Sequence, residues 1–489
     1  MKTNIIGKTI IYFKLELKTN LHIGSGESNI DTDALCIRNS EGNLMIPGTT
    51  LAGVFRSNLE RLFGEFREKE KLITDLFGIV ETNQPNVDSF ASNIIFQDAV
   101  IQTDQEVNTD IRDGIKINKE YQSTEEGAKY DKETVFKDSI FQGIITITKT
   151  NKNKDDFSKY LGLIKIVFYN LDEGLISIGG SSSRGLGLCS FNECFICELD
   201  FTKPAHFNDF LLADFYDFEK IKSEYKYKEY LKGMDFKEPL SDLPSLINDY
   251  MMIKIDYTIS TIEPLLINGP RTNDEEVDFN FVKTNNKYFI PGSSVKGPIR
   301  NRAEMILETL KINNSKDIIE KLFGSTKQKS KVQFYDLFPE DGLKIKTKYF
   351  DHNKIDRFTG GTMDNALFNE KLIFNGKFHG KIIIGRVDFN EIKLLMQIFK
   401  DLYLEDIRIG YGKAKGYGKI KGEIINLKIY KTNKLMIENM DLMENYNFEF
   451  AKGKEENIYQ ICEVSDLYSK NNKEKYKKFL KLIEERNYA

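Results

Sequence analysis

The chain has 489 residues, more than one hydrophobic core usually supports, so two or three domains of ordinary size are expected. Its 70 lysine and arginine residues face 74 acidic ones, and the net charge of -4 excludes the strongly basic signature of many nucleic-acid-binding proteins, so any contact with RNA must be local. No stretch approaches the roughly 20 uninterrupted apolar residues of a membrane span. Five cysteines without a signal peptide predict reduced thiols in a cytoplasmic protein with no membrane partner.

The first half opens with an alternating apolar strand over residues 10–17, followed by the loop HIGSGESNIDTD at residues 22–33. The turn IPGTTLAG, which begins at Ile46, then leads into a helix whose apolar residues recur at helical spacing. The hydroxyl side chains of Thr49 and Thr50 are suited to capping that helix. Together these segments predict the start of an α+β domain.

Two further segments of the first half are rich in turn residues. Residues 112–136 predict a projecting hairpin, because a turn-rich centre separates two segments that resemble strands. The sequence GGSSSRGLG at residues 179–187 predicts a loop that another backbone can approach closely. The chain lacks the G-x-x-x-x-G-K-[ST] spacing of a nucleotide-binding loop, so no nucleotide cofactor is expected.

Three cysteines follow the glycine-rich loop with the spacing C-x₄-C-x₂-C, namely Cys189, Cys194 and Cys197, and His206 lies nearby. Zinc binding is one interpretation of this cluster. The segment LCSFNECFICELDF also predicts a strand, whose alternation would separate the thiols between its two faces. We therefore expect core cysteines rather than a zinc site.

The landmarks of the first half return in the same order in the second half. The turn at Ile46 returns as IPGSSVKG at Ile290, and the strand-like IIFQDAV around Asp98 returns as VQFYDLF around Asp336. The glycine-rich loop returns as GYGKAKGYG at residues 410–418. This repetition implies a duplicated domain.

Each half predicts a β-α-β-β-α-β arrangement with an inserted hairpin, the second hairpin lying at residues 352–374. Helical spacing between the halves predicts a helical connector, and residues 470–486 predict a basic amphipathic helix. The expected division of the chain is a first domain at 1–199, a helical connector at 200–250, a second domain at 251–430 and a helical C-terminal extension at 431–489.

The first loop of each half ends on an aspartate, Asp33 in one half and Asp278 in the other, at nearly the same distance from the proline-glycine turn. A carboxylate in such a loop can hold a divalent cation, Mg²⁺ or Mn²⁺, next to bound RNA and support cleavage. The alternative is that both aspartates serve turn geometry through backbone hydrogen bonds. Asp31 competes with Asp33 for the catalytic role, and His22 is a candidate for proton transfer.

Candidate RNA-binding residues lie in the proline-glycine turns, in the helices after them and in the glycine-rich loops. Backbone N–H groups and hydroxyls at a helix start favour a phosphate, and lysine or arginine side chains add positive charge. The alternative for the turns is an ordinary capped helix. The candidates are Thr49, Thr50, Arg56, Arg184, Ser293, Ser294, Lys296, Arg300, Lys413 and Lys415.

These segments together resemble the RAMP superfamily, and specifically the backbone subunits of type III CRISPR effector complexes. The resemblance rests on HIGSGE, both proline-glycine turns, both hairpin segments and both glycine-rich loops. The fusion of two such units in one chain resembles type III-D systems. The resemblance implies two tandem ferredoxin-like domains, similar to RNA-recognition motifs, with thumb hairpins that displace a base of the guide RNA at regular intervals.

The resemblance also implies metal-dependent cleavage of target single-stranded RNA, in which a loop aspartate supports attack by the adjacent 2′-hydroxyl. That role maps onto Asp33 and onto Asp278, although Asp274, Glu275 and Glu276 crowd the second loop and argue against activity there. The implied partners are guide RNA, target RNA, the large polymerase-like subunit and neighbouring RAMP subunits. The alternatives are a non-catalytic RNA-binding scaffold and a guide-processing ribonuclease, for which the chain offers no histidine constellation.

Overall fold

The computed structural model describes residues 4–30, 32–63, 67–79, 91–102, 109–115, 125–236, 251–270, 277–340, 342–385, 389–431, 455–456 and 459–465. Asp31 and the helix predicted at residues 470–486 lie outside these ranges.

The first half is built on a seven-stranded antiparallel sheet with β1 (Ile5–Leu17) at its centre. β1 lies between β7 (Ile140–Thr150) and β8 (Cys189–Asp200). The other strands are β2 (Met45–Ile46), β3 (Ile94–Phe96), β4 (Ala99–Ile101) and β9 (Leu231–Gly233), and the helices are α1 (Gly48–Phe63), α2 (Arg67–Phe77) and α3 (Phe157–Asp172). The spatial order β8-β1-β7-β3 and the β-α-β-β-α-β chain order are those of a ferredoxin-like fold.

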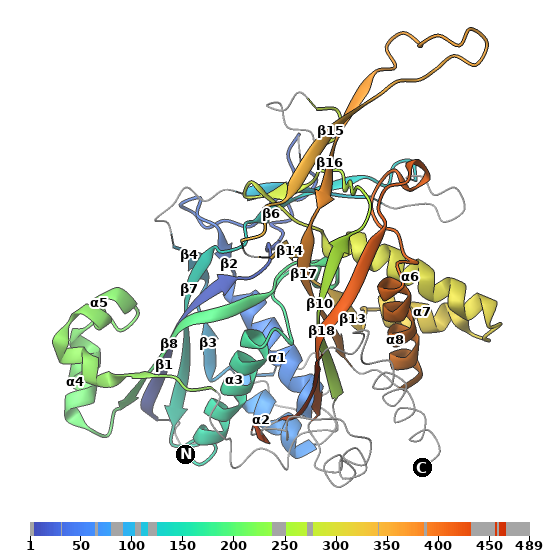
Figure 1. The fold of residues 1–489 in the computed structure, drawn as a ribbon. Coiled ribbons are helices and arrows are strands. Elements are labelled where there is room, and N and C mark those ends of the chain that lie inside the picture. Colours follow the sequence, from blue (N-terminus) through green and yellow to red (C-terminus); the bar gives the residue numbers. More distant parts are fainter. Residues whose placement is uncertain are drawn as a thin grey trace.

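The second half repeats this arrangement around β10 (Met251–Thr261), which lies between β17 (Lys377–Gly385) and β18 (Ile420–Lys431). The other elements are β13 (Val332–Phe334), β14 (Phe338–Pro339), the small hairpin β11 (Lys283–Thr284) and β12 (Lys287–Tyr288), and the helices α6 (Gly292–Thr309), α7 (Ser315–Phe323) and α8 (Phe389–Tyr403). Figure 1 shows the two sheets side by side, each with its own helices. The predicted α+β fold, duplicated in one chain, is confirmed.

The central strand β1 is buried on both faces, which explains its unbroken run of apolar residues. Ile11 and Phe13 pack in the core beneath α1 and α3, whereas Ile10 and Tyr12 point to the opposite face. There they meet residues of the connector, which contains α4 (Pro204–Leu212) and α5 (Phe218–Ser223). The connector is therefore helical over much of its described part and covers a sheet face that would otherwise be exposed (Figure 1).

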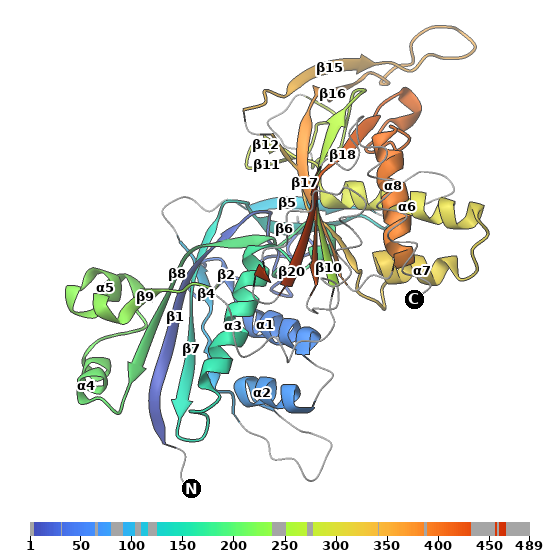
Figure 2. The same ribbon diagram turned by 60° about the horizontal axis from the view of Figure 1, so that its bottom comes forward.

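The two halves share one apolar core at their junction. Met252, Tyr335, Ile383 and Tyr430 come from the second half but pack within the core of the first. Because Met252 and Tyr430 point away from the helices of their own half, the sheet of the second half is covered on both faces as well. Figure 2 shows the two sheets meeting at this junction.

Each half carries an inserted antiparallel hairpin where the sequence predicts one. The first is formed by β5 (Thr109–Gly114) and β6 (Tyr130–Val135), and it lies at the junction of the halves (Figure 2). The second, formed by β15 (Lys346–His352) and β16 (Phe368–Asn375), projects away from both sheets (Figure 1). The same insertion thus meets different surroundings in the two halves.

The C-terminal region differs from the prediction of a helical extension. Its described parts are the strands β19 (Glu455–Glu456) and β20 (Tyr459–Ser465), and β20 pairs with β18. The edge of β18 offers unpaired backbone groups, and the alternating sequence of β20 suits that pairing. Among the described residues, no helix combines the length and the apolar character needed to cross a membrane.

Candidate functional site

The two loop aspartates occupy equivalent positions, each beside the hairpin of its own half. Oδ2 of Asp33 accepts a hydrogen bond from the backbone N–H of Asp131 at 2.8 Å, and Oδ2 of Asp278 accepts one from the backbone N–H of Asn369 at 3.0 Å. Both aspartate side chains are exposed. One carboxylate oxygen of each is thus fixed by a hairpin, while the carboxylate as a whole faces solvent.

In both halves, the hairpin residue that follows the one bonded to the aspartate joins the hairpin to the glycine-rich loop. This residue is a lysine in the first half and a glutamate in the second. In the first half Lys132 Nζ donates to Ser181 Oγ at 2.8 Å. In the second half the equivalent residue is Glu370, which is buried and accepts from Lys415 Nζ at 2.7 Å. His352 also pairs with Glu370 at 2.8 Å. This hairpin residue is therefore a cation at the first site, whereas at the second site it is a carboxylate paired with Lys415.

Positive charge gathers at the junction beside Asp33. Arg184, on the short 3₁₀ helix η1 (Ser182–Arg184) of the glycine-rich loop, is exposed and hydrogen-bonded to the hydroxyl of Tyr130. Burial, followed by repulsion from Arg184, lowers the pKa of Lys132. Burial, followed by repulsion from Arg184 and Arg300, lowers the pKa of Lys296 to about 7. Arg184 therefore lies electrostatically close to a lysine from each half.

These three cations, Lys132, Arg184 and Lys296, form the junction cluster. Lys296 Nζ donates to Ser330 Oγ at 3.0 Å, so all three have neutral hydrogen-bond partners. Within the described ranges, none of them forms an ion pair with a carboxylate. Repelling cations without a protein counter-charge favour a bound anion such as a phosphate.

Arg56 and Arg300, two predicted RNA contacts, also have equivalent places inside the fold. Arg56 pairs with Glu60 at 2.8 Å and reaches the carbonyl oxygen of Gly78 at 3.5 Å. Arg300 pairs with Glu304 at 3.3 Å and donates to the carbonyl oxygen of Gly324 at 3.0 Å. Each arginine thus ties its long helix to the end of the next helix. Contact with RNA stays a prediction for both.

The starts of α1 and α6 are capped by distant carboxylates rather than by their hydroxyl residues. The N–H of Gly48 donates to Asp98 Oδ1 at 2.7 Å, and the N–H of Gly292 donates to Asp336 Oδ1 at 2.9 Å. Glycine is required because a Cβ at either position would collide with the carbonyl oxygen of Phe96 or Phe334. A protein carboxylate therefore stabilises the helix terminus where a phosphate was predicted. Thr49 and Ser293 are exposed, Thr50 and Ser294 half-buried.

The second glycine-rich loop presents aromatic residues together with its lysines. Lys413 and Lys415 lie on the 3₁₀ helix η4 (Lys413–Lys415) and are exposed. Lys415 Nζ lies 4.7 Å from the centre of the Phe368 ring, and Tyr411 stacks on Phe279 with ring centres 5.7 Å apart. Tyr411 is partly exposed and can stack on a nucleic-acid base.

His22, the candidate for proton transfer, is buried at the head of the first loop. Its Nδ1 lies 2.7 Å from the carbonyl oxygen of Glu133, and burial lowers its pKa. Its own carbonyl oxygen accepts from the N–H of Gly180 at 2.9 Å. Through its ring and its backbone carbonyl, His22 therefore connects the first loop, the hairpin and the glycine-rich loop.

The three clustered cysteines do not meet. Cys189 and Cys194 face the core beneath α3, whereas Cys197 packs on the opposite face with the connector. Burial raises the pKa of Cys194 and of Cys197 to about 12. His206 accepts a hydrogen bond from the backbone N–H of Asp200. No group of three metal-ligating side chains occurs within the described ranges, and the three thiols pack on two faces of the sheet, as the strand pattern predicts.

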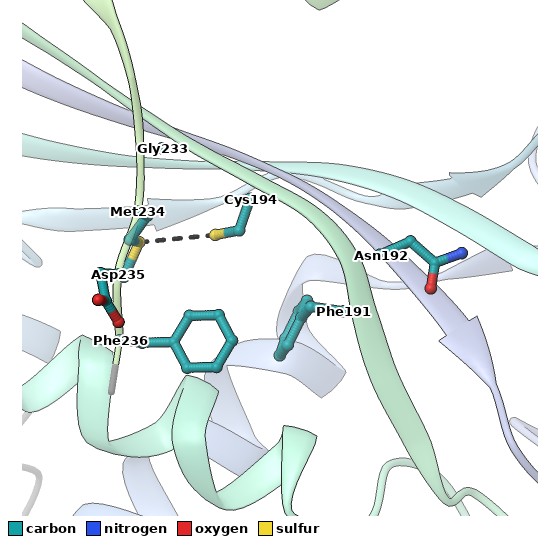
Figure 3. Close-up of a pocket in the computed structure, with 7 residues that line it drawn as sticks. All are labelled: Phe191, Asn192, Cys194, Gly233, Met234, Asp235 and Phe236. Carbon is teal, nitrogen blue, oxygen red and sulfur yellow. Dashed lines mark hydrogen bonds between the residues drawn. The ribbon is translucent and has the colours of Figure 1, made fainter. Parts of the chain in front are cut away.

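Cys194 lines an open pocket of about 430 Å³ between β8 and the residues that follow β9 (Figure 3). Its Sγ donates to Sδ of Met234 at 3.6 Å. The lining is mainly apolar, with Phe191 and Phe236 facing each other across it. Neither loop aspartate lines this pocket, whose polar side chains are Asn192, Cys194 and Asp235.

The sequence profile of the RAMP superfamily matches residues 14–190 and 258–421. The chain belongs to the RAMP superfamily. Each matched region runs from the central strand of one sheet to the strand that follows its glycine-rich loop, so the chain holds two RAMP domains in tandem. Over 213 residues the chain is 27% identical to the CRISPR system Cms endoribonuclease Csm3 of Methanocaldococcus jannaschii. That alignment covers 39% of this chain and 82% of the relative, close to the length of one RAMP domain.

Lys132 is the site residue that sequence reasoning missed. The pairing of β6 with the first loop brings its backbone next to Asp33, because Ala34 and Lys132 form an isolated bridge. The hydrogen bond between Asp33 and Asp131 spans 98 residues of chain, and no local pattern encodes such a contact. A residue-by-residue alignment of the two hairpin segments could have found it, because the equivalent positions Lys132 and Glu370 carry opposite charges.

Proposed function

We propose that this chain is an RNA-binding backbone subunit of a type III CRISPR effector complex and holds guide RNA across its two RAMP domains. Membership of the RAMP superfamily and the similarity to an endoribonuclease of a CRISPR system support this assignment. The observation that carries it is the junction cluster, in which Lys132, Arg184 and Lys296 come from both RAMP domains and lack a carboxylate partner among the described residues. Such a cluster suits an RNA backbone that crosses from one domain to the next.

We further propose that Asp33 supports cleavage of the complementary target RNA. The hairpin N–H of Asp131 orients one carboxylate oxygen, so the other can face the scissile phosphate. Lys132 pairs through its backbone with the residue after Asp33, and Arg184 is close enough to repel it, so in this proposal both cations hold neighbouring phosphates. A divalent cation, Mg²⁺ or Mn²⁺, would stabilise negative charge at the reacting phosphate when bound.

The donor set near Asp33 fits such a cation only together with RNA. No group of three ligating side chains occurs in the described part of the chain, so the described residues alone do not form a cage. Mg²⁺ is commonly bound by one or two carboxylates and completes its shell with substrate phosphates and water. Asp33 can supply one carboxylate oxygen, and RNA phosphates would supply the remaining charge.

The site of the first RAMP domain is the stronger candidate for cleavage. At the second site Glu370 and Lys415 neutralise each other, and aromatic rings of Phe279, Phe368 and Tyr411 surround them. This arrangement suits base stacking more than phosphate binding. A scaffold without cleavage is the alternative function, and it would retain the junction cluster while Asp33 only shapes its loop.

The assembled complex, incubated with labelled complementary RNA and Mg²⁺ or Mn²⁺, tests this proposal. Asp33→Asn keeps the oxygen that accepts from Asp131 but removes the charge, so we expect loss of specific cuts, by at least about 100-fold in rate, with guide RNA retained. Asp278→Asn is expected to change the cleavage pattern less. Asp155→Asn, at an exposed aspartate before α3, is the matched control. An unchanged ladder in the Asp33→Asn, Asp278→Asn double variant would favour the scaffold.

A further inference from the structure

The contact between the two RAMP domains shows how one RAMP domain seats on another. Asp336 is buried at the junction and accepts both from the N–H of Gly292 at 2.9 Å and from the guanidinium of Arg112 at 2.6 Å. Gly185 of the glycine-rich loop packs against the same carboxylate, since a Cβ there would collide with Asp336 Oδ1. The first domain thus contributes a glycine-rich loop and an arginine, and the second contributes a capped helix start.

The first domain carries the same helix start on its own outer side, without a counterpart. The N–H of Gly48 donates to Asp98, as Gly292 does to Asp336, but Asp98 is exposed and forms no ion pair with any described residue. A Cβ on Gly292 would lie 3.1 Å from the Cα of Gly185, whereas the three atoms nearest to one on Gly48 belong to Phe96 and Gln97. No described residue therefore takes the place at Asp98 that Arg112 takes at Asp336.

The residues around Asp98 are also more exposed than their counterparts around Asp336. Tyr335, next to Asp336, is buried in the core of the first domain, while its counterpart Gln97 is only half-buried. Ile95, on the strand that leads to Asp98, exposes 57% of its surface. We call the surface formed by Gly48, Thr49, Ile95, Gln97 and Asp98 the Asp98 face.

We propose that the Asp98 face docks a RAMP-type domain of a different protein, which places its glycine-rich loop against Gly48 and an arginine on Asp98. The proposal rests on the proposed function and adds which face binds the neighbour and by what chemistry. An exposed aspartate with a partly apolar rim is complementary to such a loop and arginine, because the junction within this chain buries that same set of groups.

A second copy of this chain does not supply the missing arginine. In the first hairpin Arg112 lies opposite Lys132, and in the second hairpin the residue opposite Glu370 is Phe350. Phe350 stacks on Phe374 with ring centres 5.6 Å apart. At this position the second domain therefore presents an aromatic ring where the first presents a guanidinium, which favours an arginine from another protein.

Photo-cross-linking in the native complex, purified through a tag on this chain, tests the proposal. Thr49 is replaced by benzoylphenylalanine, and in a matched control Ser293, the equivalent position of the second domain, is replaced instead. We expect Ser293 to link to the glycine-rich loop of the same chain and Thr49 to link to a glycine-rich loop of a different RAMP protein. A link from Thr49 to residues 410–418 of a second copy, to RNA, or to nothing while Ser293 links, would overturn the proposal.

A charge reversal supplies the second readout. Asp98→Arg is expected to reduce recovery of the cross-linked neighbour at least tenfold, and an Arg→Asp change at the cross-linked hairpin of that neighbour should restore it. Asp98→Asn, which keeps an acceptor for Gly48, should show a smaller loss and guards against misfolding. Guide RNA in each preparation is measured separately. Absence of RNA from the wild-type complex contradicts the proposed function, whereas RNA without a Thr49 cross-link contradicts only the docking.

Discussion

Charge crowding at three residues distinguishes the first site from its duplicate. Arg184 repels both Lys132 and Lys296, and burial makes the positive charge of each lysine costlier. A phosphate would relieve this repulsion and raise the depressed lysine pKa values. Lys296 is the most affected, because its pKa of about 7 lies far below that of a free lysine.

The pH dependence of RNA binding follows from this shift. Below about pH 7 Lys296 is protonated in the free protein, and above it the lysine must take up a proton to meet a phosphate. Affinity for RNA should therefore fall as pH rises, by up to about tenfold per pH unit for one proton. Lys296→Arg, whose guanidinium stays charged, should lose this dependence. Filter binding at constant ionic strength between about pH 6 and about pH 8 measures it, and equal pH slopes in both proteins would refute the role of Lys296.

Residue types in the loops could be predicted, but their partners could not. The repeat singled out Asp33 and Asp278 because both end a loop before the same turn, and the structure places them alike. Arg56 and Arg300 were predicted as RNA contacts from charge alone, although both also anchor a helix to a distant carbonyl. Charge in a sequence does not reveal whether a side chain already has a partner within the fold.

The glycine-rich loops share a backbone but differ in what approaches them. Gly185 and Gly416 are equivalent and both have positive φ, +114° and +87°. Gly185 touches Asp336, whereas nothing lies within 4 Å of a Cβ placed on Gly416. The loop thus acts as a docking element at the junction and remains open at the end of the second domain.

Alanine substitutions separate these two effects. Gly416→Ala should lower the free energy of unfolding only by the strain of a positive φ, about 1–2 kcal/mol. Gly185→Ala introduces the same strain and also pushes the carboxylate of Asp336 away. We expect Gly185→Ala to be the more destabilising by at least about 2 kcal/mol. The shift in the urea midpoint of the purified chain measures the difference. Equal shifts would mean that the contact at Gly185 contributes nothing.

Most elements could be predicted, since alternation and repetition are local signals. The strands around β1 and β10, both long helices after the turns and both hairpins lie where the sequence predicts them. The strand β20 could not be predicted, because its identity depends on the free edge of β18. The use of the connector to cover the second face of the first sheet also depends on tertiary packing.

At the scale of the whole molecule, the two RAMP domains are joined by a shared core and by ion pairs, among them the buried Arg112–Asp336 pair and the Lys254–Glu173 pair at 3.0 Å. Arg112 and Asp336 are 224 residues apart in the chain, and Asp336 is almost inaccessible to solvent. Net charge gave no sign of an RNA-binding surface, because acidic residues elsewhere balance the junction cluster.

Removal of Arg112 tests the strength of this junction. Arg112→Met leaves Asp336 buried without its cation and should lower the free energy of unfolding by about 3–5 kcal/mol. Burial already raises the pKa of that carboxyl in the wild type. The added change Asp336→Asn removes the uncompensated charge and should recover part of the loss. Asp98→Asn, at the exposed counterpart, should cost no more than about 1 kcal/mol. Thermal unfolding compares the variants, and identical stability of the single and double variants would argue against a buried ion pair.

The salt dependence of guide RNA binding tests the central claim most directly, namely that RNA crosses the junction on Lys132, Arg184 and Lys296. Replacing all three by alanine should weaken binding and reduce the slope of log affinity against log salt by about 2, since each phosphate contact on single-stranded RNA contributes about 0.7. Alanine at the exposed connector lysines Lys203, Lys220 and Lys232 is the matched control and should change neither quantity. Equal affinity and slope in both triple variants would contradict the account.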